Sequence, residues 1–232
     1  MIIKEVYFDN INSYKDLGLI LSKVLIKPPK IKEKKIKVPC SDKDLDLTEF
    51  SGQIHYENRI IKMVFFISGV KKSWPAVFSD VSNKLHGRRM SVILPDDQSF
   101  VWTGRVHIRE NDKKLSIGEI EVELDAEPYK MCKYSSLEEV EWDSFDLDAG
   151  VMQRLKDIEV SGTKKVTVIG YRKRVVPVFI VAGTISITVG DITWELTRER
   201  NKILDISIVE GVNEFTFSGQ GVVSIEFRGG SL

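Results

Sequence analysis

Residues Ile185 to Leu196 read ISITVGDITWEL, and this stretch decides the fold of the chain. Apolar and polar side chains alternate on both sides of Gly190-Asp191, which is the period of a half-buried β-strand. A glycine in the first position of a two-residue connection suits a type II′ turn, which joins antiparallel strands. The stretch therefore predicts a β-hairpin and an antiparallel β architecture.

The same alternation recurs along the rest of the chain. Residues 117–124 place Ile120, Val122 and Leu124 against glutamates, so one face of this strand should contact a core and the other water. Further strands are expected at residues 36–38, 59–68, 91–94, 100–108, 165–170, 175–182, 203–209, 213–217 and 222–227. Gly219-Gln220-Gly221 should form a turn between the last two. Short, regularly spaced strands predict a mainly β protein whose second half is a sandwich or jelly roll.

One helix should interrupt the strands of the first half. Its apolar stripe has helical spacing and consists of Trp74, Val77, Phe78, Val81 and Leu85. Ser73 can cap the start, Pro75 lies in the first turn and Gly87 can end the helix. We expect the stripe to pack on the open face of a sheet.

An acidic segment separates the two halves. Ala126-Glu127-Pro128-Tyr129 ends the first run of strands, and acidic residues follow. We therefore expect a domain over residues 1–130 and a second over 131–232, with 131–150 as an acidic linker.

Charge and composition exclude several classes of protein. The chain balances 34 Lys and Arg against 34 Asp and Glu, whereas nucleic-acid-binding proteins usually carry a basic surplus. A neutral surface offers little protection against self-association, which suits a protein destined for an assembly. No signal peptide and no membrane helix are expected. Cys40 and Cys132 should be reduced thiols of a protein folded in cytoplasm.

Motifs that carry chemistry are absent from the sequence. His55, His86 and His107 lack metal-ligand spacing, and no nucleophile elbow or dinucleotide loop occurs. Asp146-x-Asp148, with Glu141 and Asp143, could offer oxygen ligands to calcium, but lacks the final glutamate of an EF-hand loop. A solvated acidic linker is the favoured interpretation. We expect no enzyme activity, no catalytic residue, no metal and no cofactor.

A basic run occupies residues 27–37 and contains six lysines. It could meet phosphate or an acidic partner, but no aromatic residues interleave for base stacking. An edge strand guarded by lysines, with Pro28-Pro29 blocking further pairing, is favoured. Ile31, Ile36 and Val38 should then provide its buried contacts.

Exposed aromatic residues raise a second functional hypothesis. Trp142 lies in the acidic linker and is the candidate for a glycan-facing side chain, although it could also anchor the linker. Trp194 is in phase with Ile192 and Leu196 and should face the core. With Tyr171, these residues suggest, as an alternative function, a carbohydrate-binding module in the C-terminal sandwich that recognises host cell-surface glycans.

The order of features along the chain is similar to a known family. These features are Tyr14-Lys15-Asp16-Leu17-Gly18-Leu19, the proline-containing strand 26–29, Val38-Pro39, Leu45-Asp46-Leu47-Thr48-Glu49, Tyr56-Glu57-Asn58-Arg59, the 74–87 helix, Val175-Val176-Pro177, Leu204-Asp205 and Glu210-Gly211-Val212-Asn213-Glu214-Phe215. In this order they resemble the distal tail (Dit) proteins of long-tailed phages. Cys40-Ser41-Asp42-Lys43-Asp44 departs from the glycine-rich turn that the family often has after Val-Pro.

The resemblance implies a fold and a role. It implies an N-terminal β-sandwich-like domain with one helix and an extended hairpin or belt, followed by a galectin-like domain. It implies a non-enzymatic adaptor whose N-terminal domains form a hexameric ring. The ring would join the tail tube protein to the tail-tip or tail-associated lysin-type protein, and the C-terminal domains could hold receptor-binding or side-fibre proteins. Lys34, Lys35, Arg88 and Arg89 are the expected contacts, and the expected location is the virion tail tip, assembled in the host cytoplasm.

Overall fold

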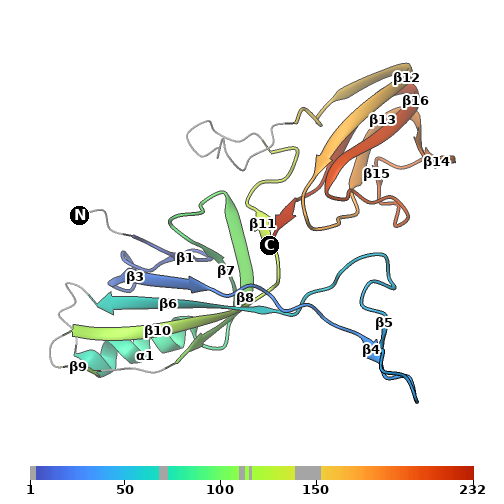
Figure 1. Cartoon of the computed structure of the whole chain (residues 1–232). Coiled ribbons are helices and arrows are strands. Elements are labelled where there is room, and N and C mark those ends of the chain that lie inside the picture. Colours follow the sequence, from blue (N-terminus) through green and yellow to red (C-terminus); the bar gives the residue numbers. More distant parts are fainter. Residues whose placement is uncertain (1–3, 68–72, 110–112, 115–116, 139–152) are drawn as a thin grey trace. The chain divides into compact units, whose positions relative to one another are not determined.

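The computed structural model describes residues 4–67, 73–109, 113–114, 117–138 and 153–232 (Figure 1). The fold is mainly β, as predicted, with one helix in the described part. Its elements are β1 (Tyr7–Phe8), β2 (Ile11–Asn12), β3 (Leu19–Ile26), β4 (Lys35–Ile36), β5 (Leu45–Asp46), β6 (Arg59–Ile67), α1 (Trp74–Leu85), β7 (Arg89–Ile93), β8 (Phe100–Ile108), β9 (Lys113–Lys114), β10 (Ile117–Ala126), β11 (Lys130–Cys132), β12 (Ile158–Gly170), β13 (Val178–Val189), β14 (Ile192–Leu196), β15 (Arg200–Asn201), β16 (Gly211–Glu226) and β17 (Gly230–Ser231).

The chain divides into two compact units. The first unit comprises Met1–Asp97 and Trp102–Pro128, and the second comprises Gln98–Val101 and Tyr129–Leu232. Each unit has its own cluster of buried apolar side chains.

The first unit is an antiparallel sheet that curls around its core. Its strands follow the order β2-β1-β7-β8-β10-β6-β3. Two backbone hydrogen bonds return from the last strand to the start of the chain, from Leu19 N–H to Ser13 C=O at 2.8 Å and from Leu21 N–H to Lys4 C=O at 3.2 Å. The strand at one end of the order is thereby connected to the segment at the other end.

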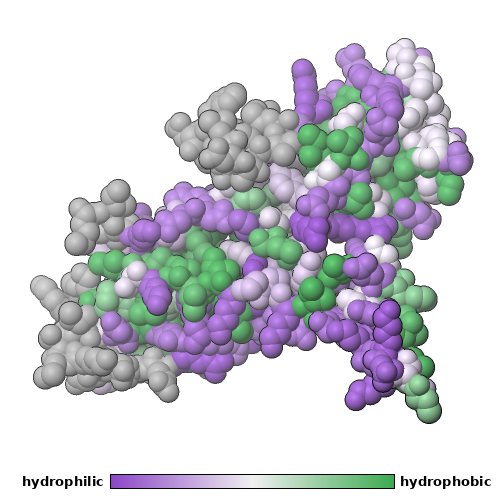
Figure 2. All heavy atoms as spheres, in the orientation of Figure 1, coloured by the Kyte–Doolittle hydropathy of each residue, from purple (hydrophilic) through white to green (hydrophobic). Residues whose placement is uncertain are grey.

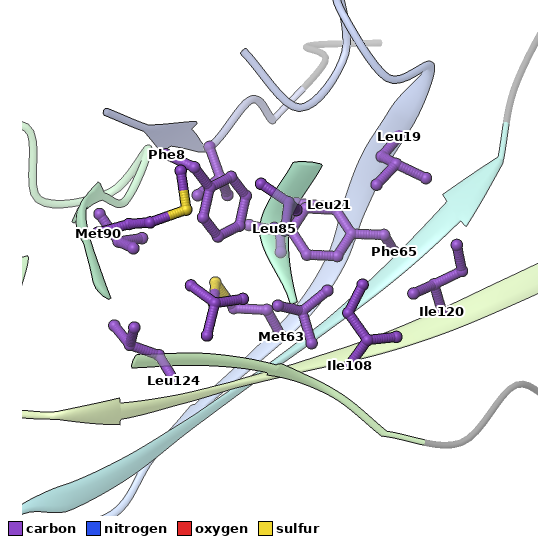
Figure 3. Packing of buried hydrophobic residues seen from close by; sticks show 14 of the residues in the cluster. Phe8, Leu19, Leu21, Met63, Phe65, Leu85, Met90, Ile108, Ile120 and Leu124 are labelled. Carbon is purple, nitrogen blue, oxygen red and sulfur yellow. The ribbon is translucent and has the colours of Figure 1, made fainter. Parts of the chain in front are cut away.

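Helix α1 contributes to the same core as this sheet. Val77, Val81 and Leu85 are buried, while Trp74 and Phe78 are partly buried against the cluster, as the helical spacing predicts. Figure 3 shows Leu85 among side chains from the strands, such as Phe8 and Phe65. Ser73 occupies the N-cap position, but its side chain makes no capping hydrogen bond, which corrects that expectation.

The second unit is built on a sheet of long strands. The order is β12-β16-β13-β14, with β15 also paired to β13. The predicted hairpin is confirmed, because Val189 pairs with Ile192 across a turn in which Gly190 has a φ of 60°. The core of the second unit includes Phe179, whose ring lies edge-on to the rings of Phe215 and Phe217 at centroid distances of 5.8 and 5.9 Å.

Two predictions for the second unit are wrong. Residues 203–209 form no strand and make only an isolated bridge, Val175 to Ile208. The segments 213–217 and 222–227 belong to one strand, β16, which continues through Gly219 and Gly221. Both glycines have a positive φ, 131° and 151°, so they change the direction of a paired strand rather than ending it.

Candidate assembly interface

Residues 27–58 form an extended hairpin, which we call the arm, between β3 and β6 of the first unit (Figure 1). Its two sides are joined by the β4–β5 pairs Lys35–Asp46 and Ile36–Leu45. Backbone hydrogen bonds of 2.8 Å extend this ladder toward the root, from Lys32 N–H to His55 C=O and from Glu57 N–H to Lys30 C=O. The arm is therefore a two-stranded ribbon, with an outgoing side over residues 27–37 and a returning side over 42–57.

The arm has no core of its own. Of its residues none is buried, and its large apolar side chains are among the most exposed of the described residues. Their exposed fractions are 45% for Ile31, 47% for Ile36, 42% for Val38, 51% for Leu45 and 86% for Phe50. The expectation that Ile31, Ile36 and Val38 make buried contacts is therefore wrong for a single protomer. Figure 2 shows apolar and hydrophilic residues side by side on the arm.

Exposure of this kind is costly for an isolated hairpin. A two-stranded ribbon is marginally stable in water unless a further strand or surface covers it. Clustered exposed apolar side chains mark interaction sites in soluble proteins. The arm is therefore the described part of the chain that most needs a partner surface.

Charges are sorted between the two sides of the arm. The outgoing side has six lysines against Glu33, a formal charge of +5, and the returning side has five carboxylates against Lys43, a formal charge of −4. Lys35 donates a hydrogen bond to the Glu33 carboxylate at 2.7 Å, and this bond raises the pKa of Lys35. Hydrogen bonds from Thr48 lower the pKa of Asp46.

Arg59 fixes the root of the arm. It is almost fully buried, lies over the Trp102 ring at 5.0 Å from the ring centroid, and donates to the carbonyl oxygens of Lys27 at 2.9 Å and Pro128 at 3.3 Å. Desolvation lowers the pKa of Arg59. One guanidinium thus ties the point where the chain leaves β3 to the end of β10.

The four expected contact residues fall on two different parts of the first unit. Lys34 and Lys35 are exposed on the outgoing side of the arm. Arg88 and Arg89 are exposed where α1 is followed by β7; Arg88 donates to the Asn83 carbonyl at 3.1 Å, and Arg89 pairs with Glu127. Contacts among the described residues do not join the lysines to the arginines, so their role as partner contacts stays a prediction.

A charge network lies on the sheet face opposite the buried side chains of β10. Glu123 accepts hydrogen bonds from Arg109 at 3.0 and 3.2 Å, and Lys62 lies 2.8 Å from Glu121 and 3.8 Å from Glu123. Arg109 is the main cause that lowers the pKa of Glu123. The expectation that all glutamates of this strand face water is wrong for Glu123, which is buried by these cations.

Residues expected to bind other ligands are not gathered into a site in the described part of the chain. Trp142 and the candidate calcium ligands Glu141, Asp143, Asp146 and Asp148 lie outside the described residues. Trp194 is half-buried against the second core, as expected, and Tyr171 packs on the same core. Within the described ranges, no group of His, Cys, Asp and Glu side chains has the arrangement of a metal site.

The histidines and cysteines have ordinary surroundings. His86 accepts a hydrogen bond from the Ile108 backbone N–H at 3.0 Å, and His55 is 2.9 Å from the Ser51 hydroxyl. Cys40 is exposed and Cys132 is half-exposed, and both are free thiols. Burial raises the pKa of Cys132.

None of the helices in the described part of the chain is both long and apolar enough to cross a membrane.

Sequence reasoning missed Phe50 and Arg59. Phe50 stands among polar residues in Leu47-Thr48-Glu49-Phe50-Ser51-Gly52, a context without strand or helix periodicity that would have marked a lone aromatic as exposed. Arg59 opens an apolar strand, and its burial depends on Trp102 and Pro128, which are distant in sequence.

Comparisons with known proteins support the fold described above. No protein-family model and no curated protein matches the chain. Among solved structures, the chain is similar to the crystal structure of SPP1 Dit (gp 19.1), described as a paradigm of the hub adsorption apparatus in phages that infect Gram-positive bacteria. The match covers 100% of both chains with a TM-score of 0.66 and 11% sequence identity. The chain therefore has the fold of a phage distal tail protein, the family that its sequence resembles.

Proposed function

We propose that this protein is a non-enzymatic adaptor at the tail tip of a phage or a phage-tail-like particle. In this role six copies form a ring that joins the end of the tail tube to the tail-tip proteins. The observation that carries the proposal is the arm, a ribbon with exposed apolar side chains and without a buried residue, in a chain whose fold matches SPP1 Dit over its whole length.

The arm supplies the contact that a ring requires. A ring closes through a heterologous interface, in which one surface of each copy meets a different surface of the next. Fully burying a large apolar side chain stabilises a contact by about 1.5–3 kcal/mol. Phe50, Leu45 and Ile36 would therefore contribute several kcal/mol to each subunit contact.

The second unit has a different part in this proposal. We assign it the role of a platform for receptor-binding or side-fibre proteins, with residues 1–130 as the ring-forming domain and 131–232 as the platform. Carbohydrate binding is less well supported, because Trp194 and Tyr171 are both half-buried against the core rather than displayed together.

The proposal is tested with the full chain and an armless variant. Lys27 N–H donates to Ile60 C=O at 3.2 Å, so the two ends of the arm are neighbours. Replacing residues 28–58 by Asn-Gly should close β3 and β6 with a tight turn. Arg59 remains in this variant and keeps its hydrogen bond to Lys27.

Size-exclusion chromatography with light scattering and negative-stain imaging provide the readout. We expect rings with the mass of six copies for the full chain, and a folded monomer for the armless variant. Binding of the ring to the tail tube protein and to the tail-tip protein of the same particle tests the adaptor role. A full chain that stays monomeric at high concentration would refute the ring, and a ring that binds neither protein would refute the adaptor.

A further inference from the structure

We propose that His86 forms a pH-sensitive link, which binds the C-terminal end of α1 to β8 when the imidazole is neutral and releases it when the imidazole is protonated. The link lies in the first unit and acts within one protomer, so it does not depend on the proposed ring. Histidine is the side chain that ordinarily changes its charge between about pH 5 and 8. The link therefore opens over this range of pH.

The segment between α1 and β7 is bonded to β8 by its backbone. Gly87 N–H donates to the Val106 carbonyl at 2.8 Å, and Val106 N–H donates to the Arg88 carbonyl at 2.9 Å. These bonds extend the β7–β8 ladder, in which Arg89 pairs with Arg105. Gly87 has a φ of 76°, so the segment forms a bulge at the point where the ladder meets the helix.

The next donor along β8 is the backbone N–H of Ile108. Continued pairing would bring a backbone carbonyl to this N–H, but the chain before His86 is the helix, which ends at Leu85. The backbone N–H of His86 is itself bonded to the Ser82 carbonyl of α1 at 2.9 Å. Nδ1 of the His86 ring accepts the Ile108 N–H at 3.0 Å and so replaces the missing carbonyl.

The charge of the imidazole determines whether this bond exists. A neutral imidazole has one nitrogen that accepts a hydrogen bond, whereas both nitrogens of the protonated ring are donors. After protonation, the N–H at Nδ1 and the N–H of Ile108 would face each other, so the ring has to turn away. His86 is exposed and its ring can turn into water, which leaves Ile108 N–H without its acceptor.

The charged groups around His86 offer no replacement for this bond. From β8, the His107 ring lies edge-on to the His86 ring at a centroid distance of 6.0 Å, and Arg105 donates to the Gly87 carbonyl. The other charged groups of the adjoining elements have partners of their own: Lys84 with Asp80, Arg88 with the Asn83 carbonyl, Arg89 with Glu127, Arg109 with Glu123 and Lys62 with Glu121. Among the described residues, no carboxylate forms an ion pair with either imidazole.

Hydrogen exchange of the Ile108 amide in the full chain measures the link. Exchange is compared at about pH 7.5 and about pH 5.5, after correction for the intrinsic dependence of exchange on pH. We expect the protection of this amide to fall at least about tenfold at the lower pH, because it then exchanges by local opening. The backbone bonds of Gly87 and Arg88 do not involve the imidazole, so the opening should be confined to the end of the ladder.

Two substitutions fix the link in its two states. His86→Asn keeps an acceptor oxygen and does not titrate, so the Ile108 amide should be equally protected at both pH values. His86→Ala has no acceptor, so this amide should be weakly protected at both, at the level of the unaltered chain at about pH 5.5. His55→Asn on the arm is the matched control and should behave like the unaltered chain.

The same measurements can overturn the proposal in three ways. The unaltered chain could protect the Ile108 amide equally at both pH values. The fall in protection could persist in His86→Asn, in which case another titrating group, such as His107, or dissociation of an assembly carries the response. Full protection in His86→Ala at about pH 7.5 would show that the imidazole is not the acceptor.

Discussion

Replacement of Phe50 by serine should separate assembly from folding. The Phe50 side chain is 86% exposed in the protomer. The folded monomer therefore loses almost no buried apolar surface when the phenyl group of Phe50 is removed. We therefore expect the free energy of unfolding to change by less than about 0.5 kcal/mol, as for other surface substitutions.

The effect on the ring should be much larger. Fully burying a phenylalanine against a neighbouring copy contributes about 1.5–3 kcal/mol relative to leaving it exposed. Because each 1.4 kcal/mol corresponds to about tenfold in a dissociation constant, each contact should weaken by roughly ten- to a hundredfold. Closure of a ring multiplies this loss over all of its contacts.

Dilution series followed by light scattering measure the assembly, and thermal unfolding measures the fold. Phe65→Ala is the matched control, because Phe65 is fully buried in the first core and its truncation should cost about 3–5 kcal/mol of stability. Unaltered ring formation by the Phe50→Ser chain would refute the reasoning that the exposed arm aromatic is an assembly contact. A large loss of thermal stability would show that Phe50 packs within its own protomer.

Three further substitutions test the structure. Arg59→Met should lower the free energy of unfolding by about 1–3 kcal/mol, because it removes two hydrogen bonds to the Lys27 and Pro128 carbonyl groups and the cation–π contact with Trp102. Arg88→Met at an exposed site should change it little, and thermal unfolding measures both. The pKa of Glu123 is lowered, so its stabilisation is present above the ordinary glutamate pKa of 4.5 and is lost as the pH falls through the lower folded-state pKa. Glu123→Gln should flatten the acid limb of stability in urea unfolding from pH 3 to 7, and a limb as steep as that of the unaltered chain would contradict this. Gly219→Ala should destabilise the second unit more than Gly162→Ala. A Cβ at Gly219 would lie 2.1 Å from the Thr184 carbonyl oxygen, whereas a Cβ at Gly162 would meet nothing within 4 Å. Equal free energies of unfolding for the two variants would contradict this.

The local parts of the fold follow from the sequence. The apolar run over Arg59–Ile67, the alternation of Ile120, Val122 and Leu124 with glutamates, the helical stripe from Trp74 and the Gly190-Asp191 turn are all patterns of residues close in the chain. These periods are set by backbone geometry, and they place side chains on a face before any tertiary contact forms.

In the second unit, the same reasoning wrongly predicted a turn at two glycines. Gly219 and Gly221 have the composition of a turn, yet β16 remains paired through them with both β12 and β13. A Cβ at Gly221 would lie 2.2 Å from the Ala182 carbonyl oxygen, so the neighbouring strand approaches the backbone too closely for any side chain. This requirement comes from the partner strand and cannot be read from the local sequence.

The sequence predicted only part of the candidate interface. Its lysine run and its Pro28-Pro29 pair indicate an edge, and the resemblance to distal tail proteins implies a belt. Alternation alone could not show that the hairpin leaves the sheet, because a ribbon covered by its own protomer and a ribbon covered by a neighbour require the same pattern of side chains.

There is a physical reason why the sequence alone does not show which chain covers the arm, and the exposed residues Ile31, Ile36 and Val38 illustrate it. Apolar residues at these positions predict burial, and the prediction fails in the protomer, where each is more than two-fifths exposed. The hydrophobic effect depends on the area removed from water and not on which chain covers it. In the proposed ring, the same residues are covered by the next copy, and the sequence rule that fails for one chain holds for the assembly. Exposure of apolar residues in an ordered, core-free hairpin is therefore the observation that distinguishes an assembly element from an ordinary surface loop.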